Sequence, residues 1–163
     1  RNVKWLSKII LSDEESEGPW QRSIAYKVIP RDVKDARKID SSKIPTMQEM
    51  PIQSAITTIE KEDDKFIVSG YAYTGSGNEI AKVEISNDNG ITWNKTELNN
   101  ELNKNQKHWA WTIWSIKVPI SCNRCFICRA TDINGNIQPS DISNKWNLRG
   151  LNNNTFHKKI SEK

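Results

Sequence analysis

The pattern of apolar and polar positions changes near residue 49. From there on, short segments alternate apolar and polar residues and are separated by turn residues, which is typical of β-strands. The segment 65–77, KFIVSGYAYTGSG, places Phe66, Val68 and Ala72 on one side and ends in a Gly-rich turn. No helical period follows residue 49. The pattern therefore predicts an all-β fold, an antiparallel β-sandwich.

Two segments of this region are predicted to form a hairpin. Residues 80–86 (IAKVEIS) and 91–98 (ITWNKTEL) are joined by NDNG at residues 87–90, whose side chains tolerate the positive φ of hairpin turns. Asp88 also raises the question of a calcium loop. The spaced carboxylates and closing Glu of such a loop are missing, so the segment is interpreted as a turn.

The segment 108–119, HWAWTIWSIKVP, is apolar on both faces if it is a strand. Trp109, Trp111 and Ile113 would share one face. Ala110, Thr112, Trp114 and Ile116 would share the other. Such a strand is predicted to be covered on both sides, by the core and by another segment, domain or subunit. Further strands are predicted at CFICRATD and TFHKKI, with INGN as a turn.

The first 48 residues differ in character. Residues 3–11 form an apolar, strand-like run, and GPWQ at residues 18–21 forms an aromatic corner. A strand without a partner in the next 50 residues suggests the tail of something larger. Residues 27–48 mix charges with Pro30 and Pro45 and are interpreted as a linker.

Composition excludes several classes of protein. The 163-residue chain has a net charge of +4 and a mean hydropathy of −0.72. Its basic residues are spread along the chain rather than clustered, so no nucleic-acid partner is expected. No apolar run approaches the ~18 residues that cross a bilayer, and the start lacks the features of a signal peptide, so no membrane partner is expected.

Candidate chemistry is sparse. Cys122, Cys125 and Cys128 form no disulfide framework, because their number is odd. They are also not expected to bind zinc, because a fourth ligand could come only from distant His108 or His157, and Cys125 and Cys128 would point to opposite faces of a strand. With two histidines in the chain, no hydrolytic triad can be assembled. The residues alone therefore reveal no catalytic site.

The order of motifs nevertheless resembles a known family. Six motifs are similar, in order and spacing, to the C-terminal part of eukaryotic sulfite oxidases. They are VKWL at the start, QEMPIQSAI at 48–56, the segment 70–93, WAWTIWSIKVP, CRATDINGNIQP, and WNLRG followed by NNNTFHK. The resemblance implies that residues 1–26 are the tail of a molybdenum-cofactor domain and that residues 27–48 are a linker. Residues 49–163 would form an immunoglobulin-like dimerisation domain, so the fold is an immunoglobulin-like antiparallel β-sandwich with an N-terminal extension.

The resemblance also implies roles for single residues. Arg149 matches the arginine of the family that reaches the mouth of the active site and helps to bind the sulfite anion. Lys4 matches the family's lysine that contacts molybdopterin, with Asn2 and Val3 at neighbouring contact positions. Asn2 replaces the family's usual Ser. Without the resemblance, both Arg149 and Lys4 would be interpreted as solvated surface charges.

The function implied is that of the dimerisation portion of a molybdenum-dependent sulfite oxidase, an oxidoreductase that converts sulfite to sulfate and passes electrons to haem, cytochrome or oxygen. The molybdenum–molybdopterin cofactor is expected in the full-length parent and not in this chain, which alone is expected to be inactive because none of its cysteines matches the family's molybdenum ligand. A homodimer is expected, in the mitochondrion, with the peroxisome or cytosol as alternatives. Two other functions stay open: a non-catalytic immunoglobulin-like interaction module, and the equivalent part of a nitrate reductase, which commonly carries Met in place of this Arg.

Overall fold

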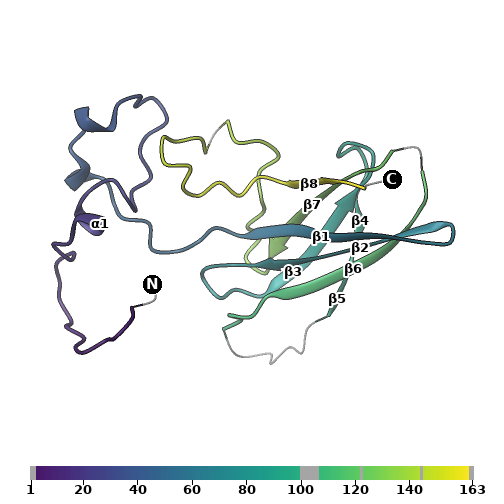
Figure 1. The fold of residues 1–163 in the computed structure, drawn as a ribbon, viewed down its shortest axis with the longest axis horizontal. Helices are drawn as coiled ribbons and strands as arrows, with labels where there is room; N and C mark the ends of the chain where they lie inside the picture. Colours follow the sequence, from purple (N-terminus) through teal and green to yellow (C-terminus); the bar gives the residue numbers. More distant parts are fainter. Residues whose placement is uncertain (1–2, 100–106, 122, 144, 162–163) are drawn as a thin grey trace. The chain divides into compact units, whose positions relative to one another are not determined.

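The computed structural model describes residues 3–99, 107–121, 123–143 and 145–161. The chain divides into two compact units, the first made of residues 1–47 with 147–151 and the second of residues 48–146 with 152–163 (Figure 1). All the strands within the described residues belong to the second unit. They are β1 (Gln53–Glu62), β2 (Lys65–Tyr73), β3 (Ile80–Ser86), β4 (Asn94–Lys95), β5 (Glu97–Asn99), β6 (Thr112–Pro119), β7 (Cys125–Asp132) and β8 (His157–Ile160).

The second unit is built from two antiparallel sheets. One sheet has the strand order β1-β2-β6-β5 and the other has the order β4-β3-β7-β8 (Figure 1). The strands of each sheet pair antiparallel throughout. The predicted all-β, antiparallel sandwich is therefore confirmed.

The two sheets share one apolar core. Phe66 of β2 packs edge-to-face on Phe126 of β7, with ring centroids 5.6 Å apart. Trp114 of β6 is fully buried, as are Val83 and Cys128 of the opposite sheet. Alternate residues of the strands supply this core because successive side chains of a strand point to opposite faces. Its members are Ile52, Ile56, Phe66, Val68, Ala72, Ile80, Val83, Ile85, Trp114, Val118, Phe126, Cys128 and Ala130.

Gly70 of β2 makes room for the Trp114 ring. The two residues are cross-strand neighbours, and Gly70 is paired with Ile56 on its other side. A Cβ at this position would lie 2.0 Å from the Ala55 carbonyl oxygen and 2.4 Å from the Trp114 ring. Only glycine therefore fits between the indole and β1 without displacing one of them.

The predicted hairpin forms, but its second strand is divided between the sheets. Asn94 pairs with Ile85 of β3, so β3 and β4 make the hairpin in one sheet. Leu98 instead pairs with Trp114 of β6 in the other sheet. Between them, buried Thr96 donates its N–H to the Val83 carbonyl at 2.9 Å. The strand expected over residues 91–98 is therefore two short strands that change sheets at Thr96.

The first unit contains no strand within its described residues. Its helical turns are α1 (Pro19–Arg22) and the 3₁₀ helices η1 (Ala36–Lys38) and η2 (Ser41–Lys43). The strand expected over residues 3–11 is wrong: the segment has a turn at its start and otherwise lacks regular structure, and Leu11 is 95% exposed. A strand needs a neighbour for its backbone hydrogen bonds, and no described segment pairs with this one. None of the helices described is long and apolar enough to span a membrane.

Candidate functional site

Arg149 stands on a turn that is organised by the buried side chain of Asn147. The Asn147 Oδ1 atom accepts hydrogen bonds from the backbone N–H groups of Arg149 at 3.1 Å and Leu151 at 3.2 Å. Its Nδ2 donates to the Leu151 carbonyl at 2.7 Å. Gly150 completes the turn, with φ at +63° and its N–H bonded to the Asn147 carbonyl at 3.0 Å. One asparagine thus fixes the backbone on both sides of Arg149.

The turn presents the Arg149 side chain outward. Arg149 is exposed, whereas Asn147 is only 4% exposed. No hydrogen bond or ion pair within the described part of the chain engages the guanidinium. An exposed guanidinium on a fixed backbone retains its five donors for an anion. The sequence analysis predicted neither the Asn147-organised turn nor the exposed guanidinium. The signals for the turn are present in Asn-Leu-Arg-Gly, because Asn can bond to nearby backbone groups and Gly accepts a positive φ.

The predicted cofactor contacts lie at the start of the first unit. Asn2 lies outside the described residues. Val3 is 67% exposed, Lys4 is also exposed, and the Lys4 Nζ atom lies 5.9 Å from the centroid of the Trp5 ring. No described contact joins either residue to Arg149. Their assignment to the cofactor therefore stays a prediction.

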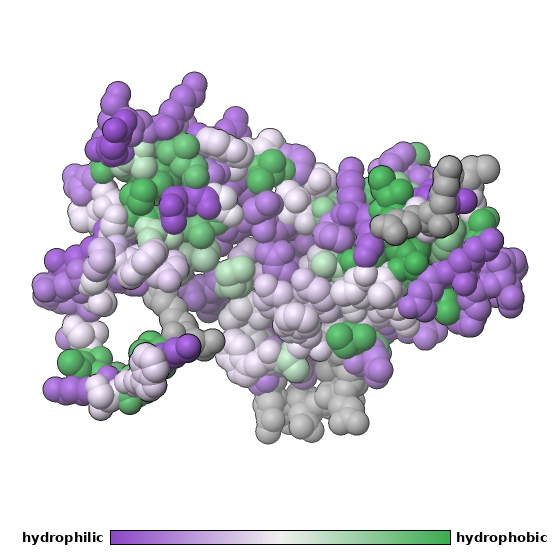
Figure 2. All heavy atoms as spheres, in the orientation of Figure 1, coloured by the Kyte–Doolittle hydropathy of each residue, from purple (hydrophilic) through white to green (hydrophobic). Residues whose placement is uncertain are grey.

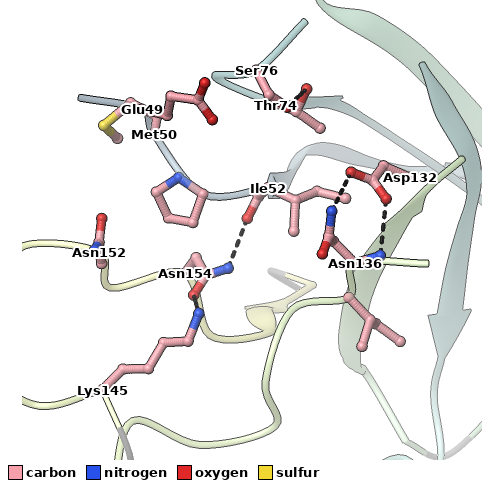
Figure 3. A pocket seen from close by; sticks show the side chains of 12 residues that line it. Glu49, Met50, Ile52, Thr74, Ser76, Asp132, Asn136, Lys145, Asn152 and Asn154 are labelled. Carbon is pink, nitrogen blue, oxygen red and sulfur yellow. Dashed lines mark hydrogen bonds between the residues drawn. The ribbon is translucent and has the colours of Figure 1, made fainter. Parts of the chain in front are cut away.

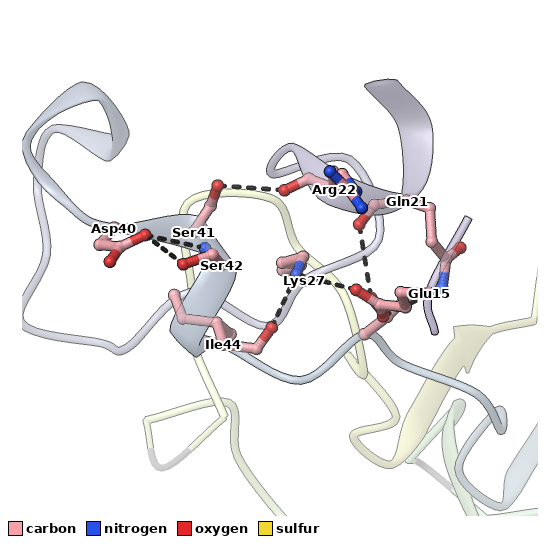
Figure 4. A network of polar contacts seen from close by, with 9 residues as sticks. Glu15, Gln21, Arg22, Lys27, Asp40, Ser41, Ser42 and Ile44 are labelled. Atoms are coloured by element: carbon pink, nitrogen blue, oxygen red, sulfur yellow. Dashed lines mark hydrogen bonds and ion pairs between the residues drawn. The ribbon is translucent and has the colours of Figure 1, made fainter. Parts of the chain in front are cut away.

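A second lysine of the first unit, Lys27, is buried and bonded to other residues of that unit. Lys27 is 1% exposed, donates to the Ile44 carbonyl at 2.9 Å and forms an ion pair with Glu15 at 3.5 Å (Figure 4). Glu15 also accepts hydrogen bonds from Thr46 and from Gln21. The Thr46 hydroxyl contributes most to holding the pKa of Glu15 below its usual value, despite some desolvation. Lys27 therefore compensates a carboxylate and is not available to a ligand.

The second unit has a polar cavity of about 340 Å³ at one end of the sandwich (Figure 3). Its lysine, Lys145, donates to Asn154 Oδ1 at 3.0 Å, and Asn154 in turn donates to the Ile52 carbonyl at 3.0 Å. Asp132 accepts from the Asn136 side chain at 2.9 Å and from Asn78 at 3.0 Å. Burial alone would raise the pKa of Asp132, but the hydrogen bonds to its carboxylate have the larger combined effect. The pKa of Asp132 therefore lies below its usual value. These polar groups brace the loops around the cavity.

The cysteines do not provide a metal site in the described structure. Cys128 is fully buried, and desolvation raises the pKa of its thiol to about 11. Cys125 is partly exposed and lies three residues away on the same strand, and Cys122 lies outside the described residues. Among the residues that the structure describes, no three His, Cys, Asp or Glu side chains gather as a ligand set. Cys128 belongs to the apolar core and its Sγ atom lies 3.4 Å from the Ser54 Oγ atom, so this thiol is packed inside the sandwich rather than presented to a ligand.

Comparison with known proteins identifies the relatives of this chain. Residues 44–163 match the family described as the Mo-co oxidoreductase dimerisation domain. The mitochondrial sulfite oxidase of Rattus norvegicus is 38% identical over 165 residues, and that of Homo sapiens is 36% identical, each covering 97% of this chain. An NADH nitrate reductase of Ulva prolifera is 32% identical and covers 96% of the chain.

The match is to only part of each relative. The chain spans 30% of the length of the two sulfite oxidases and 20% of the nitrate reductase. The matched region nevertheless covers both sheets of the sandwich and the Arg149 turn. The chain therefore belongs to the Mo-co oxidoreductase dimerisation domain family, in its sulfite oxidase-type form.

Proposed function

We propose that this chain is the dimerisation portion of a molybdenum-dependent sulfite oxidase and that Arg149 contributes to its sulfite-binding pocket. The observation that carries the proposal is the similarity to sulfite oxidases over 97% of the chain, together with the family match over residues 44–163, which contain the WNLRG turn. The exposed guanidinium of Arg149 and the Asn147-organised backbone beneath it support the assignment.

Arg149 would bind sulfite through charge and shape together. The planar guanidinium can donate two parallel hydrogen bonds to an oxyanion, which an ammonium cannot do. Because Asn147 fixes the turn before the anion arrives, little backbone freedom would be lost on binding. Hydrogen bonds to a charged group contribute about 1.5 to 3 kcal/mol, or about a 10- to 150-fold change in affinity.

The residues of this chain would assist the cofactor from its periphery. When bound in the parent protein, molybdenum–molybdopterin supplies the two-electron oxidation of sulfite to sulfate. The ammonium of Lys4 is exposed and suits the phosphate of a pterin cofactor, with Val3 and Asn2 beside it in sequence. None of the cysteines of this chain lies in a motif that matches the family's molybdenum ligand, so that ligand would come from another part of the parent.

The proposed partner and compartment follow the relatives. A dimerisation domain implies a homodimer, and the rat and human relatives are mitochondrial sulfite oxidases. We therefore place the parent protein in the mitochondrion as a homodimer that acts on sulfite.

Nitrate reduction is the second candidate because the Ulva prolifera relative matches nearly the whole chain. Arg149 favours sulfite, since nitrate reductases resembling this stretch commonly carry Met there. Purified full-length parent that reduces nitrate and leaves sulfite unoxidised would reverse this preference. A parent that loads no molybdenum cofactor would instead favour a non-catalytic interaction module.

Arg149→Met in the full-length, cofactor-loaded parent tests the proposed role. The substitution should raise the KM for sulfite about 10- to 150-fold, and Arg149→Lys should recover only part of that loss, because the planar fork is gone. Arg124→Met, at another exposed arginine, is the matched control and should leave KM unchanged. Normal sulfite kinetics in Arg149→Met, or a loss of folding in circular dichroism, would refute the role.

A further inference from the structure

A loop between β7 and β8 carries Arg149, and a buried amide closes the base of this loop. The Arg149 loop is defined here as residues 139–155. Gln138, which is 1% exposed, donates hydrogen bonds from Nε2 to the carbonyls of Asn154 and Thr155, each at 3.1 Å. The residue that precedes the loop is therefore bonded to the last residues of the loop.

The Gln138 side chain is itself fixed by the strands of the sandwich. Its Oε1 atom accepts hydrogen bonds from the Ser54 hydroxyl of β1 at 2.5 Å and from the Ala130 N–H of β7 at 2.9 Å. The amide thus uses both its donors and both its acceptor sites. A buried amide that is fully bonded resists rotation, because any other orientation leaves a polar group unpaired in the interior.

A second bond crosses the loop closer to Arg149. The Lys145 Nζ atom donates to Asn154 Oδ1 at 3.0 Å, and Asn154 Nδ2 donates to the Ile52 carbonyl at 3.0 Å (Figure 3). Asn154 is only 2% exposed. Lys145 precedes Arg149 in the chain and Asn154 follows it, so this bond joins the two flanks of the turn that Asn147 organises.

We propose that Lys145 and Asn154 are positioning residues for Arg149, because their hydrogen bond keeps the two flanks of its turn together. The inference rests on the proposed function of Arg149 in sulfite binding. Asn147 determines the backbone conformation within the turn, whereas the Lys145–Asn154 bond limits how far the whole turn can move. A displacement of about 1 Å at a binding group can cost about 100-fold in rate, so a small gain of freedom at the flanks would weaken the site.

The geometry favours support over direct contact with the anion. Asn154 has both polar atoms of its side chain bonded inside the second unit. Lys145 is half-buried, and its ammonium donates to Asn154. Arg149 is exposed, and its guanidinium retains donors for a ligand. The arginine is therefore the group that would meet sulfite, and the other two residues would act through it.

Loss of this bond should loosen the loop rather than unfold the sandwich. Lys145→Met would leave the buried Asn154 Oδ1 atom without this donor, and such a group gains hydrogen bonds with water if the loop opens. Little apolar burial opposes the opening, because Trp146 is 43% exposed and Leu148 is 39% exposed. Segments with few buried apolar contacts open locally, below the free energy of global unfolding.

Hydrogen exchange of the 163-residue chain tests the loosening without the cofactor. In Lys145→Met, the amides of Arg149 and Leu151 should exchange at least about tenfold faster, because they are protected only while the turn stays closed. The amides of β2 (Lys65–Tyr73) should exchange at the wild-type rate. Lys145→Arg, which keeps a cationic donor, should restore most of the protection.

Lys61→Met is the matched control for the loss of one lysine charge. Lys61 is exposed on the β1–β2 hairpin, where hydrophilic side chains gather (Figure 2). Its substitution should leave exchange in the Arg149 loop unchanged, because screening by water and salt leaves a distant surface charge little influence.

Sulfite kinetics of the full-length, cofactor-loaded parent test the positioning role. Lys145→Met and Asn154→Ala should each raise the KM for sulfite by about 5- to 50-fold and leave kcat within about twofold, and Lys145→Arg should stay close to wild type. In the Arg149→Met background, Lys145→Met should raise KM no further, because residues that act through one group are not additive. The control Lys61→Met should leave KM unchanged.

The outcomes separate this inference from the proposed function. Wild-type exchange in Lys145→Met, or faster exchange with a normal KM, overturns the positioning role and leaves sulfite binding by Arg149 intact. A further rise in KM in the Arg149→Met background also overturns it, since Lys145 would then contact the anion directly. A normal KM in Arg149→Met overturns the proposed function itself. If Asn154→Ala does not fold, Lys145→Met, at a half-buried side chain, decides.

Discussion

The two faces of the β1-β2-β6-β5 sheet carry similar side chains but differ in what covers them. On the inner face, Trp114 is fully buried against Gly70 and the opposite sheet. On the outer face, Trp111 is stacked on Tyr71 and remains 60% exposed. The apolar pattern therefore predicts the strand, but the position of the second sheet determines which face of the strand is buried in the core.

The difference separates two kinds of energetic role. A side chain of the inner face contributes to the stability of the single chain, because its apolar area leaves water on folding. A side chain of the outer face can make a similar contribution only when a partner covers it. Substitutions on the two faces should therefore affect different equilibria.

Trp114→Ala should have the largest effect on folding. Removing a fully buried indole leaves a cavity in the shared core, and such a change costs about 3 to 5 kcal/mol of unfolding free energy. Denaturant unfolding at low-micromolar protein measures the loss. A loss below about 1 kcal/mol would mean that the inner face is not the core.

Gly70→Ala should have the next largest effect. The added methyl group would lie 2.0 Å from the Ala55 carbonyl oxygen, so β1 or the Trp114 ring must move. Overpacking of this kind costs about 1 to 3 kcal/mol. Ser69→Ala, on the other face of the same strand, is the control and should change stability much less in the same unfolding experiment.

Trp111→Ala should have the smallest effect on the single chain. With the ring already 60% exposed, its removal should change the unfolding free energy by less than about 1 kcal/mol at concentrations where the chain is monomeric. At higher concentration the same substitution should weaken dimerisation by about tenfold or more. A large loss of monomer stability without any effect on dimerisation would make Trp111 a structural residue.

Much of the sandwich could be predicted from alternation. The strands β2, β3, β6, β7 and β8 lie within segments whose pattern indicated them. β1 was not assigned, because a bulge between Ile56 and Thr58 breaks its period and Thr57 and Thr58 are both exposed. The change of sheet at Thr96 could not be predicted either, since alternation does not reveal which neighbour a strand pairs with.

The site was less predictable than the fold. The role of Arg149 came from resemblance alone, because a single exposed arginine has no periodicity or spacing that points to an anion. The structure adds the physical basis of the turn, in which Asn147 holds the backbone and Gly150 accepts a positive φ. The sequence did predict that both faces of residues 108–119 are apolar, but an alternating pattern cannot identify what covers the second face.

Sedimentation equilibrium of the wild-type chain tests most directly whether the outer face is covered by a second copy. At high micromolar concentration, the chain should have about twice its single-chain mass of 18.8 kDa, and the folded Trp111→Glu, Ile113→Glu variant should return to 18.8 kDa under the same conditions. A wild-type mass of 18.8 kDa, or a variant that remains dimeric, would contradict the account.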